Sequence, residues 1–573
     1  MTTYNPAAYR EFFERGFTYL AGFRRNTHRY ADRVALHCPL TNTSWTYAEL
    51  GSRVDRLAAG LVEAGVRPDD VVVYQLYNGP EFAHLYLATQ ACGAVGSPIN
   101  FRLAPSETAF ILDDSRPKVV VYDTELSTTT RAALECAKHR PKLVVAVGEG
   151  DPMPSAGQSR VVRFEELLAA DAPPPTVSRT VYEETTRLYT SGTTGMPKGV
   201  PLNSMVEIFT AHDVIMHCPL SPEDRTLNMT PWFHRGGLYV GGPSPAFYVG
   251  AQVVPMRAFD PKRCLDYVER FGLTYLIGAP TTLEMLARIQ AERPRDLSTL
   301  RGIVTMGAPL EREAALRYQK LLSPRIFNGY GTTETHWNTF LRPGDLPAHA
   351  GSAGRACTDD DVAVVKVFED RLASPQEQVA KDGAEIGEVI VRSPKCGYAY
   401  ANAPEAEAAK FHNSWFYLGD LATWDAEEFV TIVGRKDDML ISGGENVQPV
   451  QVEEILNEHP GIRDSMVVGV PHEKWGQLVV AYVVRSDFAL TAADCERHCR
   501  QHPRLAPYKR PRAYRFVDEL PLTATGKKMH YRATQQAVVD YAQGLFETAE
   551  PTQATGNNDP HRTTRGEPPH DVR

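Results

Sequence analysis

The sequence predicts an α/β protein with a large N-terminal body of parallel or mixed sheets covered by helices, and a small mobile C-terminal α+β domain. Helical and strand periods alternate between Val34 and Asn100 and again after Val200, which is typical of a parallel sheet covered on both faces. After Gly434 the elements become shorter and mixed. A chain of 573 residues also exceeds what one hydrophobic core holds.

The first alternating region begins with an amphipathic helix. Thr46 to Glu49 reads as a capping box, and Gly65 ends the helical pattern. The apolar residues that recur on one helical face are Leu50, Val54, Leu57 and Leu61. This pattern predicts a helix with one buried face.

Strands and helices then follow in turn. The segment VVVYQL from Val71 predicts a strand, and residues 80–92 predict a helix. The apolar segment AVGSPIN comes next, after which SETAFILDDS and KVVVYD repeat the alternation. The segment APPPTVS, at Pro173 to Pro175, predicts an exposed connection within the large body.

Changes in texture suggest the domain boundaries. We expect an N-terminal domain over residues 1–434, a hinge over 435–438 and a mobile C-terminal domain over 439–546. Residues 547–573 contain almost no apolar side chains to offset the entropy cost of ordering, so we expect a flexible tail there.

The net charge of the chain narrows the classes of molecule that it could bind. The chain has 61 Lys and Arg against 70 Asp and Glu, a formal net charge of −9, which disfavours nucleic acid and membrane surfaces. Four charges in the first 15 residues interrupt any secretory leader, and no stretch of about 18 apolar residues predicts a membrane span. We therefore expect a cytoplasmic protein, and the sequence leaves a homo-oligomer open.

The nine cysteines are an odd number, thinly spread, and indicate a reducing compartment rather than a disulfide framework. One group has helical spacing and could be read as metal ligands: Cys495, His498, Cys499 and His502. No second Cys or His pair follows at zinc-finger spacing, so we favour a surface helix.

The segment LYTSGTTGMPKGV, Leu188 to Val200, is dense in groups that bind phosphate. Flexible glycines, hydroxyl donors and one cation suit a polyphosphate. These residues are Thr190, Ser191, Gly192, Thr193, Thr194, Gly195 and Lys198. The spacing does not match the Walker loop, and a Gly/Ser linker would not explain the Pro-Lys-Gly ending.

Five motifs in order carry a family resemblance. They are YTSGTTGMPKG, NGYGTTE at Asn328 to Glu334, LGD at Leu418 to Asp420, GRKDDMLISGGENVQPVQVE from Gly434, and LPLTATGK from Leu520. Over roughly Ala31 to Arg532 the chain resembles the AMP-forming acyl-CoA synthetases of the adenylate-forming superfamily. Its motifs most resemble those of aryl- and acyl-CoA ligases.

The resemblance implies an ATP-, Mg²⁺- and CoA-dependent ligase for a small-molecule carboxylic acid. A carboxylate is a poor electrophile because its charge is delocalised and its leaving group would be oxide. In this family the carboxylate attacks the α-phosphorus of ATP and expels pyrophosphate, and a thiol then displaces AMP from the acyl-adenylate. Positioning and charge stabilisation dominate the first step.

The resemblance also implies roles for individual residues. The loop from Thr190 to Lys198 would hold the β- and γ-phosphates, and Glu334 would hold Mg²⁺. Asp420 and Arg435 would bind the ribose. The remaining nucleotide contacts would come from Asn328, Gly329, Tyr330, Gly331, Thr332 and Thr333, with Tyr330 against the adenine.

The C-terminal part would supply the catalytic cation and the thiol tunnel. Lys527 would lie between the carboxylate and the α-phosphate, and the domain would rotate about Asp437 between the two steps. Gly443 and Gly444 would line the pantetheine tunnel. Trp475 would contact the pantetheine arm, or it packs the small domain.

The segment PWFHRGGLYVGG, Pro231 to Gly242, matches the wall of the acid pocket. His234 would be a gate or carboxylate neighbour with a catalytic role, and the resemblance implies that Gly237, Gly307 and Gly329 would belong to the same pocket. We expect the four glycines of this segment, at 236, 237, 241 and 242, to leave volume for a bulky aromatic or polycyclic acid. The alternative is that they allow close helix packing.

Some positions depart from the family pattern. Leu418 replaces a usual Thr, and Ala356, Thr358 and Asp359 stand where Pro, Pro and Gly are common. Weakened adenylation is one consequence to weigh, with the protein performing only thioester formation from a preformed adenylate. The sequence also leaves open transfer to a carrier-protein thiol, a non-catalytic acyl- or nucleotide-binding scaffold, and a luciferase-like oxygenase.

Overall fold

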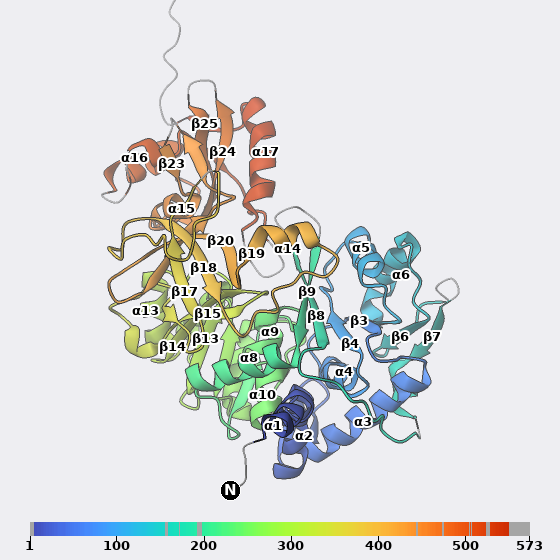
Figure 1. The fold of residues 1–573 in the computed structure, drawn as a ribbon. Helices are drawn as coiled ribbons and strands as arrows, with labels where there is room; N and C mark the ends of the chain where they lie inside the picture. The colour runs from blue at the N-terminus through green and yellow to red at the C-terminus, as the bar shows by residue number, and fades with distance from the viewer. Residues whose placement is uncertain are drawn as a thin grey trace, which may run out of the picture. The chain divides into compact units, whose positions relative to one another are not determined.

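A computed structural model describes residues 5–154, 159–170, 172–191, 197–368, 370–442, 445–472, 475–502, 505, 507–522 and 528–548 (Figure 1). The described residues form two compact units. The first holds residues up to Asp437 together with 522, 528 and 529, and the second holds 438–521 and 530–548. The hinge movement that the sequence predicts at residues 435–438 stays a prediction.

A seven-stranded sheet forms one half of the first unit. All its neighbouring strands are parallel except the last pair. In spatial order the strands are β7 (Arg160–Arg163), β6 (Leu143–Val147), β5 (Val119–Asp123), β3 (Val71–Gln75), β4 (Val95–Pro98), β8 (Glu184–Ser191) and β9 (Pro197–Asn203).

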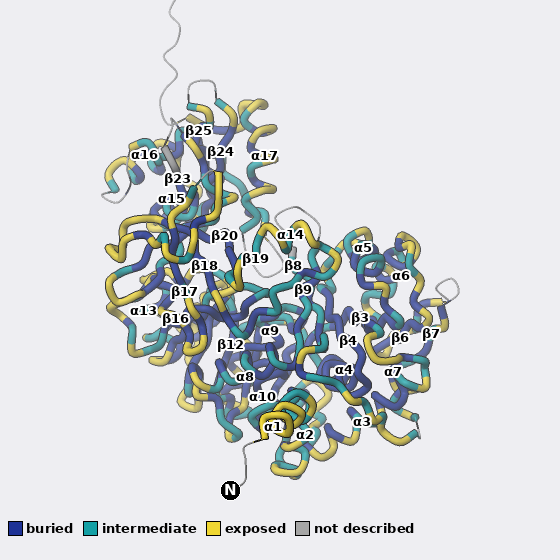
Figure 2. The backbone as a smooth tube through the Cα atoms, viewed as in Figure 1, coloured by how far each residue is buried: buried dark blue, intermediate teal, exposed yellow. Residues whose placement is uncertain are grey.

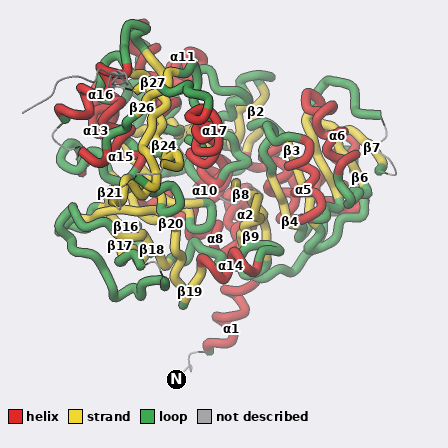
Figure 3. The backbone as a smooth tube through the Cα atoms, turned by 90° about the horizontal axis from the view of Figure 1, so that it is seen from above, coloured by secondary structure: helices red, strands yellow, loops and turns green. Residues whose placement is uncertain are grey.

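Helices cover both faces of this sheet, as the alternating pattern predicts. One face packs on α3 (Tyr47–Glu63), α4 (Pro80–Ala91) and α7 (Phe164–Leu168), and the other on α5 (Pro105–Ser115) and α6 (Ser127–Cys136). Figure 3 shows α5 and α6 beside the strands. The capping box at Thr46 and Glu49 is confirmed, and α4 is buried on nearly all sides (Figure 2).

A nine-stranded sheet forms the other half. Its central strands are parallel and its ends antiparallel. The spatial order is β16 (Arg355–Ala356), β15 (His336–Leu341), β14 (Ile326–Thr332), β13 (Gly302–Met306), β12 (Tyr275–Gly278), β10 (Arg225–Asn228), β11 (Gln252–Val253), β1 (Val34–Cys38) and β2 (Thr43–Thr46).

This second sheet is also covered on both faces. One core contains α11 (Pro261–Phe271), α12 (Pro280–Glu292) and α13 (Arg312–Leu321), and the other contains α8 (Ser204–His217). Five further helices of the first unit are α1 (Pro6–Glu11), the π-helix η1 (Phe12–Gly16), α2 (Tyr19–Arg29), α9 (Arg235–Tyr239) and α10 (Pro243–Val249). Of these, α2, α9 and α10 bury side chains in the same core as α3 and α4.

The first unit ends in a small antiparallel sheet. Its strands are β17 (Asp361–Val365), β18 (Gly387–Arg392), β19 (Phe411–His412), β20 (Trp415–Trp424) and β21 (Val430–Arg435). Helix α14 (Pro404–Lys410) lies between β18 and β19 in the chain. Short 3-10 turns are η2 (Thr124–Leu126), η3 (Pro343–Asp345) and, in the second unit, η4 (Pro507–Lys509).

The described residues of the second unit form a mixed sheet with three α-helices. It contains β22 (Leu440–Ser442), β23 (Glu445–Val447), β24 (Ile462–His472), β25 (Gly476–Arg485), β26 (Ala513–Phe516), β27 (Glu547–Thr548), α15 (Pro449–Asn457), α16 (Ala492–Gln501) and α17 (His530–Ala542). Helix α16 buries Cys495 and Cys499 in the core of this unit, so their thiols pack as small apolar groups.

Regular structure extends further toward the C-terminus than the sequence predicts. Glu547 and Thr548, assigned to the flexible tail, instead form β27 on the edge of β26, because backbone pairing does not require apolar side chains. Residues 549–573 of the predicted tail lie outside the described residues. All nine cysteines are free. No described helix is both long and apolar enough to cross a bilayer.

Candidate active site

Three of the predicted site residues lie where parallel strands of the nine-stranded sheet end. His234 follows β10, Gly307 follows β13, and Tyr330 lies in the last part of β14. The carboxyl ends of neighbouring parallel strands meet at one edge of the sheet, and loops at such an edge form ligand sites in open α/β sheets. The fold therefore brings together motifs that are about 100 residues apart in sequence.

The NGYGTTE motif forms the end of β14 and the turn into β15. A bulge interrupts the pairing between Tyr330 and Gly331. A Cβ on Gly331 would lie 1.5 Å from the carbonyl oxygen of His336. Only glycine permits this close return of the chain. The bulge thus explains the second glycine of the motif by backbone geometry.

Asp420 links this strand to the small antiparallel sheet. The Tyr330 hydroxyl donates to Asp420 Oδ2 across 2.6 Å, and Arg435 donates to Asp420 Oδ1 across 2.7 Å. Burial and the adjacent Asp420 raise the pKa of Tyr330 well above its usual value. Burial alone would lower the pKa of Arg435, but Asp420 and Asp437 raise it. Each carboxylate oxygen keeps a lone pair that ribose hydroxyls could use.

The phosphate motif forms the hairpin between β8 and β9. Thr190 and Lys198 lie opposite each other in the antiparallel register. The Tyr189 hydroxyl donates to Asp114 Oδ2 of α5 across 2.6 Å, and this hydrogen bond ties β8 to α5. The tip of the motif lies outside the described residues: Gly192, Thr193, Thr194, Gly195 and the side chain of Ser191.

Tyr400 joins this hairpin to the predicted metal ligand. Its hydroxyl donates to Glu334 Oε1 across 2.6 Å, and the Lys198 ammonium lies 5.7 Å from the centre of its ring. The next residue, Ala401, donates its backbone N–H to the Gly199 carbonyl across 2.8 Å. Burial and Glu334 raise the pKa of Tyr400, so the hydroxyl stays protonated and keeps donating.

The residues around Glu334 fit a Mg²⁺ ion with phosphate ligands. The carboxylate is partly exposed, and among the described residues no cation forms an ion pair with it. Mg²⁺ prefers oxygen ligands and is commonly held by one or two carboxylates plus phosphate oxygens. The hydrogen bond from Tyr400 orients one carboxylate oxygen and leaves lone pairs for a hard cation.

His234 is the N-cap residue of α9 and lies beside a group of aromatic rings. Its ring centre lies 4.2 Å from that of Phe233, which lies 5.3 Å from Phe101, and Phe101 lies 4.4 Å from Tyr77. Burial and Arg102 lower the pKa of His234 to about 4, so the ring is neutral at pH 7. Its Nε2 atom is buried and has no hydrogen-bond partner among the described residues.

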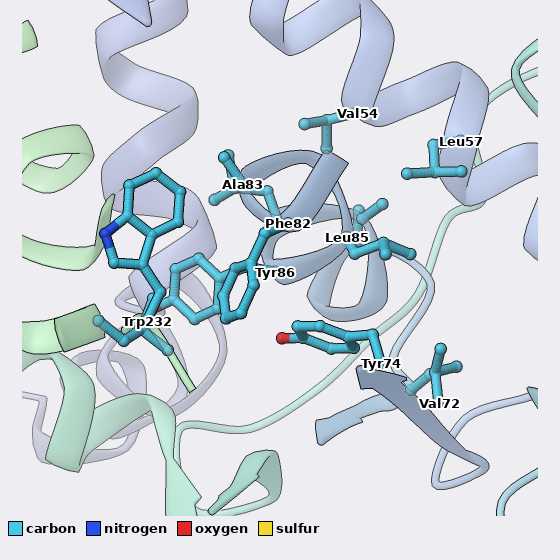
Figure 4. Close-up of a cluster of buried hydrophobic side chains, with 14 of the residues drawn as sticks. Val54, Leu57, Val72, Tyr74, Phe82, Ala83, Leu85, Tyr86 and Trp232 are labelled. Carbon is cyan, nitrogen blue, oxygen red and sulfur yellow. The ribbon is translucent and has the colours of Figure 1, made fainter. Parts of the chain in front are cut away.

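The core beneath this segment holds it in place. Trp232 packs edge-on against Phe82 of α4, with ring centres 5.6 Å apart (Figure 4). The Asn78 side chain accepts a hydrogen bond from the Trp232 backbone N–H across 2.8 Å. The position of His234 is therefore set by both halves of the first unit.

The idea that glycines of this segment leave pocket volume is wrong. A Cβ on Gly237 would lie 1.9 Å from the Pro231 carbonyl oxygen, and one on Gly242 would lie 2.0 Å from that of Gly237. A Cβ on Gly241 would lie 2.4 Å from the Ile277 side chain, and one on Gly236 would lie 2.9 Å from the end of the Met306 side chain. These glycines serve close packing, which is the alternative that the sequence left open.

The other two glycines of the predicted pocket differ from each other. Gly307 has φ of +85°, and no atom lies within 4 Å of the point where a Cβ would stand, so it faces open space. Gly329 lies against Trp337, whose Nε1 atom would be 2.4 Å from a Cβ there. Gly307 therefore borders free volume, whereas Gly329 makes room for an indole ring.

Several predicted residues belong to other parts of the chain. Lys527, Gly443 and Gly444 lie outside the described residues. Trp475 packs on the core of the second unit, and Arg512 lies 5.9 Å from the centre of its ring. Asp437 lies 3.9 Å from Arg435. The proposed roles of all five residues stay predictions.

Sequence reasoning missed three side chains at the site. Tyr400 binds Glu334, while Arg235 donates to the Thr333 carbonyl and also to the Lys395 carbonyl across 3.0 Å. Lys395 is itself buried. The tyrosine-containing segment GYAYANAPE was a weak sequence signal that Tyr400 belongs to a functional site. Nothing in the local sequence distinguishes Lys395 from a surface lysine.

The described residues include the set that the sequence predicts for an adenylate-forming enzyme: the β8–β9 hairpin, Glu334 held by Tyr400, and Asp420 paired with Arg435. Comparison with known proteins agrees. The AMP-binding enzyme family matches residues 23–400, and the AMP-binding enzyme C-terminal domain matches residues 451–527. The chain belongs to the AMP-binding enzyme family.

Two named relatives narrow the class of enzyme to the CoA ligases. The chain is 35% identical over 486 residues to feruloyl-CoA synthase of an Amycolatopsis species, covering 85% of this chain and 92% of the relative. It is 34% identical over 500 residues to indoleacetate–CoA ligase of Aromatoleum aromaticum, covering 86% and 93%. The protein is therefore an AMP-forming acid–thiol ligase of the acyl-CoA synthetase type.

A solved structure shares the fold. The anthranilate CoA ligase AuaEII, in complex with anthranoyl-AMP, is 27% identical, with a TM-score of 0.79 over 92% of this chain and 98% of that one. The predicted fold class, a large α/β body and a smaller C-terminal domain, is confirmed.

Proposed function

We propose that this enzyme converts an aromatic or arylalkyl carboxylic acid to its CoA thioester, with ATP and Mg²⁺, through an acyl-adenylate. The observation that carries the choice of acid is the ring group Tyr77, Phe101, Phe233 and His234, at the edge where the two parallel sheets present their loops. Aromatic rings bind other rings by stacked or edge-on contacts. The relatives named for ferulate and indoleacetate support the same class.

In the first step the acid carboxylate attacks the α-phosphorus of ATP and pyrophosphate leaves. Thr190 and Lys198, with the rest of their hairpin, bind the leaving phosphates. Asp420 and Arg435 hold the ribose, and Tyr330 lies against the adenine. Magnesium held by Glu334 would neutralise charge on the phosphates. Lys527 supplies positive charge where the carboxylate meets phosphorus.

In the second step the CoA thiol attacks the acyl carbon and AMP leaves. A neutral His234 presents no second positive charge and keeps its Nε2 lone pair or proton for the acid. We propose that rotation about Asp437 separates the two steps, with Gly443, Gly444 and Trp475 at the pantetheine arm. We also propose a cytoplasmic location, where ATP and CoA are both present.

An acid panel tests this proposal. Hydroxamate trapping and CoA-thioester formation would be measured with hydroxycinnamates, arylacetates, benzoates, acetate and long-chain fatty acids, each as free acid and as synthetic adenylate. We expect a hydroxycinnamate or arylacetate to exceed acetate by about a hundredfold in kcat/KM, since ring burial contributes roughly 3 kcal/mol. Acetate or a fatty acid as the fastest substrate would contradict the acid class.

The same panel separates the competing functions. Thioester from synthetic adenylate but none from free acid and ATP would indicate a protein that performs only the second step. Hydroxamate formation without CoA thioester would indicate a carrier-protein thiol as acceptor. No turnover in either arm would indicate a binding scaffold.

A further inference from the structure

The side chain of Lys395 is buried in the first unit, with 1% of its surface exposed. Its ammonium lies 2.9 Å from Asp213 Oδ2, 3.0 Å from Asp360 Oδ2 and 2.5 Å from the Trp337 carbonyl oxygen. The three partners satisfy its three N–H donors. Burial would lower the pKa of Lys395, but Cys357, Asp213 and Asp360 raise it above its usual value. The side chain is therefore a fully paired buried cation.

These contacts connect four separate segments. Asp213 lies on α8, Trp337 on β15 and Asp360 immediately before β17, while Lys395 follows β18. The Lys395 carbonyl also accepts a hydrogen bond from Arg235 of α9 across 3.0 Å. Lys395 thus joins α8 and β15 through its side chain, and α9 through its backbone carbonyl, to the small antiparallel sheet.

The network continues into the nucleotide motif. Asn338 donates to Asp360 Oδ2 across 3.1 Å and accepts from the Thr335 hydroxyl across 2.6 Å. The Thr335 hydroxyl lies 3.2 Å from that of Thr332. A continuous path of polar contacts, buried except at Thr332, therefore runs from Lys395 to the two ends of the turn that contains Thr333 and Glu334.

Arg235 holds the same turn from its other side. Its guanidinium donates to the Thr333 carbonyl and to the Lys395 carbonyl. The turn is consequently fixed by side chains from α9, from the segment after β18 and from the connection before β17. These contacts hold the backbone that carries Glu334, whose carboxylate is oriented by the hydroxyl of Tyr400.

A metal ion does not fit this cluster. Asp213, His217 and Cys357 lie close enough to bind one, with ligand atoms within 4.8 Å of one another. However, the Lys395 ammonium already lies on Asp213, and Arg342 donates to His217 Nδ1 across 2.9 Å. The other ring nitrogen, Nε2, lies 3.3 Å from the Thr358 backbone N–H and 3.2 Å from Asp213 Oδ1, so both nitrogens of His217 already have protein partners.

We propose that Lys395 is a positioning residue for the first half-reaction: through Asp360, Trp337 and Arg235 it fixes the Thr332–Glu334 turn that receives Mg²⁺ and ATP. The inference rests on the proposed role of Glu334 as the metal ligand. Residues that orient a metal ligand commonly change metal affinity or activity by about 10- to 100-fold when they are replaced. The second half-reaction uses no pyrophosphate or ATP, so it depends less on this turn.

The test uses the full-length enzyme and a charge-balanced variant. Lys395→Met alone would leave two buried carboxylates without their cation, so the main variant is Lys395→Met with Asp360→Asn, in which Asp213 keeps His217 as its partner. Asp360→Asn alone is the milder variant, because Lys395 keeps Asp213. Arg295→Met is the matched control: its side chain is 5% exposed and pairs with Asp266 away from the site.

Two rates are measured for each folded variant: acid-dependent pyrophosphate exchange over a range of Mg·ATP, and thioester formation from synthetic adenylate. For the double variant we expect the Mg·ATP KM of exchange to rise about tenfold or more, with the adenylate rate within about threefold of the parent. Asp360→Asn should shift the same KM in the same direction by less. Arg295→Met should change neither rate while lowering Tm.

Three results would overturn the inference. They are an unchanged Mg·ATP KM in the double variant, an equal fall of both rates in proportion to the folded fraction, or one zinc per chain in the purified enzyme. Glu334→Gln is assayed in parallel. An unchanged Mg²⁺ requirement in Glu334→Gln would contradict the metal role in the proposed function, whereas an unchanged KM in the Lys395 variant contradicts only the present inference.

Discussion

The Tyr330 hydroxyl donates to Asp420 across 2.6 Å and so joins the nucleotide strand of the nine-stranded sheet to the small antiparallel sheet. The two residues are 90 positions apart. The contact combines the expected adenine platform and the expected ribose acceptor in one rigid unit. Binding of the nucleoside therefore depends on both sheets at once.

Loss of this contact should weaken ATP binding. Tyr330→Phe keeps the ring but removes the hydroxyl, and we expect the KM for ATP to rise about fivefold, equivalent to about 1 kcal/mol for one hydrogen bond. Tyr417→Phe is the matched control, because Tyr417 lies on the same small sheet and donates to the Ala373 carbonyl instead. An equal rise of the ATP KM in both variants would refute a specific role for Tyr330.

Tyr400 should control the use of magnesium. Tyr400→Phe removes the hydrogen bond to Glu334 Oε1, so the carboxylate loses its orientation and we expect the Mg²⁺ concentration for half-maximal exchange to rise about tenfold. Tyr398→Phe provides the control, since its hydroxyl lies 3.1 Å from the Ser393 carbonyl. A normal magnesium titration for Tyr400→Phe would exclude the proposed orientation.

Lys527 should act only in adenylate formation. Lys527→Ala removes the charge expected between carboxylate and α-phosphate, and we expect pyrophosphate exchange to fall about 100- to 1,000-fold. Thioester formation from synthetic adenylate should stay within about threefold of the parent. Lys528→Ala tests whether any neighbouring lysine has the same effect. The assignment fails if exchange persists in Lys527→Ala.

His84 should make the protein sensitive to acid. It is buried on α4, neither ring nitrogen has a hydrogen-bond partner among the described residues, and burial lowers its pKa to about 3. Between pH 6.5 and 3 the unfolded chain therefore binds one proton more than the folded chain. The free energy of unfolding falls as the pH drops through this window, by about 1.4 kcal/mol per pH unit at most.

Replacing His84 should remove that contribution. In His84→Leu we expect a smaller slope of unfolding free energy against pH, measured by urea denaturation between pH 6 and 4.5. The decrease should correspond to about one bound proton fewer in the difference between the unfolded and folded chains. His28→Leu is the control because His28 is exposed. Identical slopes for His84→Leu and the parent would show that His84 does not couple folding to protonation.

The glycines of the His234 segment should be sensitive to any side chain. Gly237→Ala would place a Cβ 1.9 Å from a backbone oxygen, and overpacking of this kind costs about 1–3 kcal/mol. Gly344→Ala is the matched variant, since nothing lies within 4 Å of its Cβ position and we expect a change within about 1 kcal/mol. Thermal unfolding compares the two, and similar Tm values would contradict the packing role.

Local sequence rules predicted much of the fold. The capping box at Thr46 and the apolar face of α3 depend on residues within one or two helical turns, and the structure forms both as predicted. The same holds for β3 and α4. The predicted start of the flexible tail was wrong at residues 547–548, because these residues pair as β27 with β26, a strand that is distant in sequence.

The sequence by itself determined the motifs, their order and the chemistry that those residue types support, because these properties belong to short segments. Only the tertiary structure decided which side chains hold the motifs: Tyr400 reaches Glu334 over 66 residues, and Lys395 reaches Asp213 over 182. It also decided that Gly237 serves packing rather than pocket volume. The physical reason is that burial and ion pairing are set by neighbours in space, and a local pattern carries no record of which distant segment will lie alongside it.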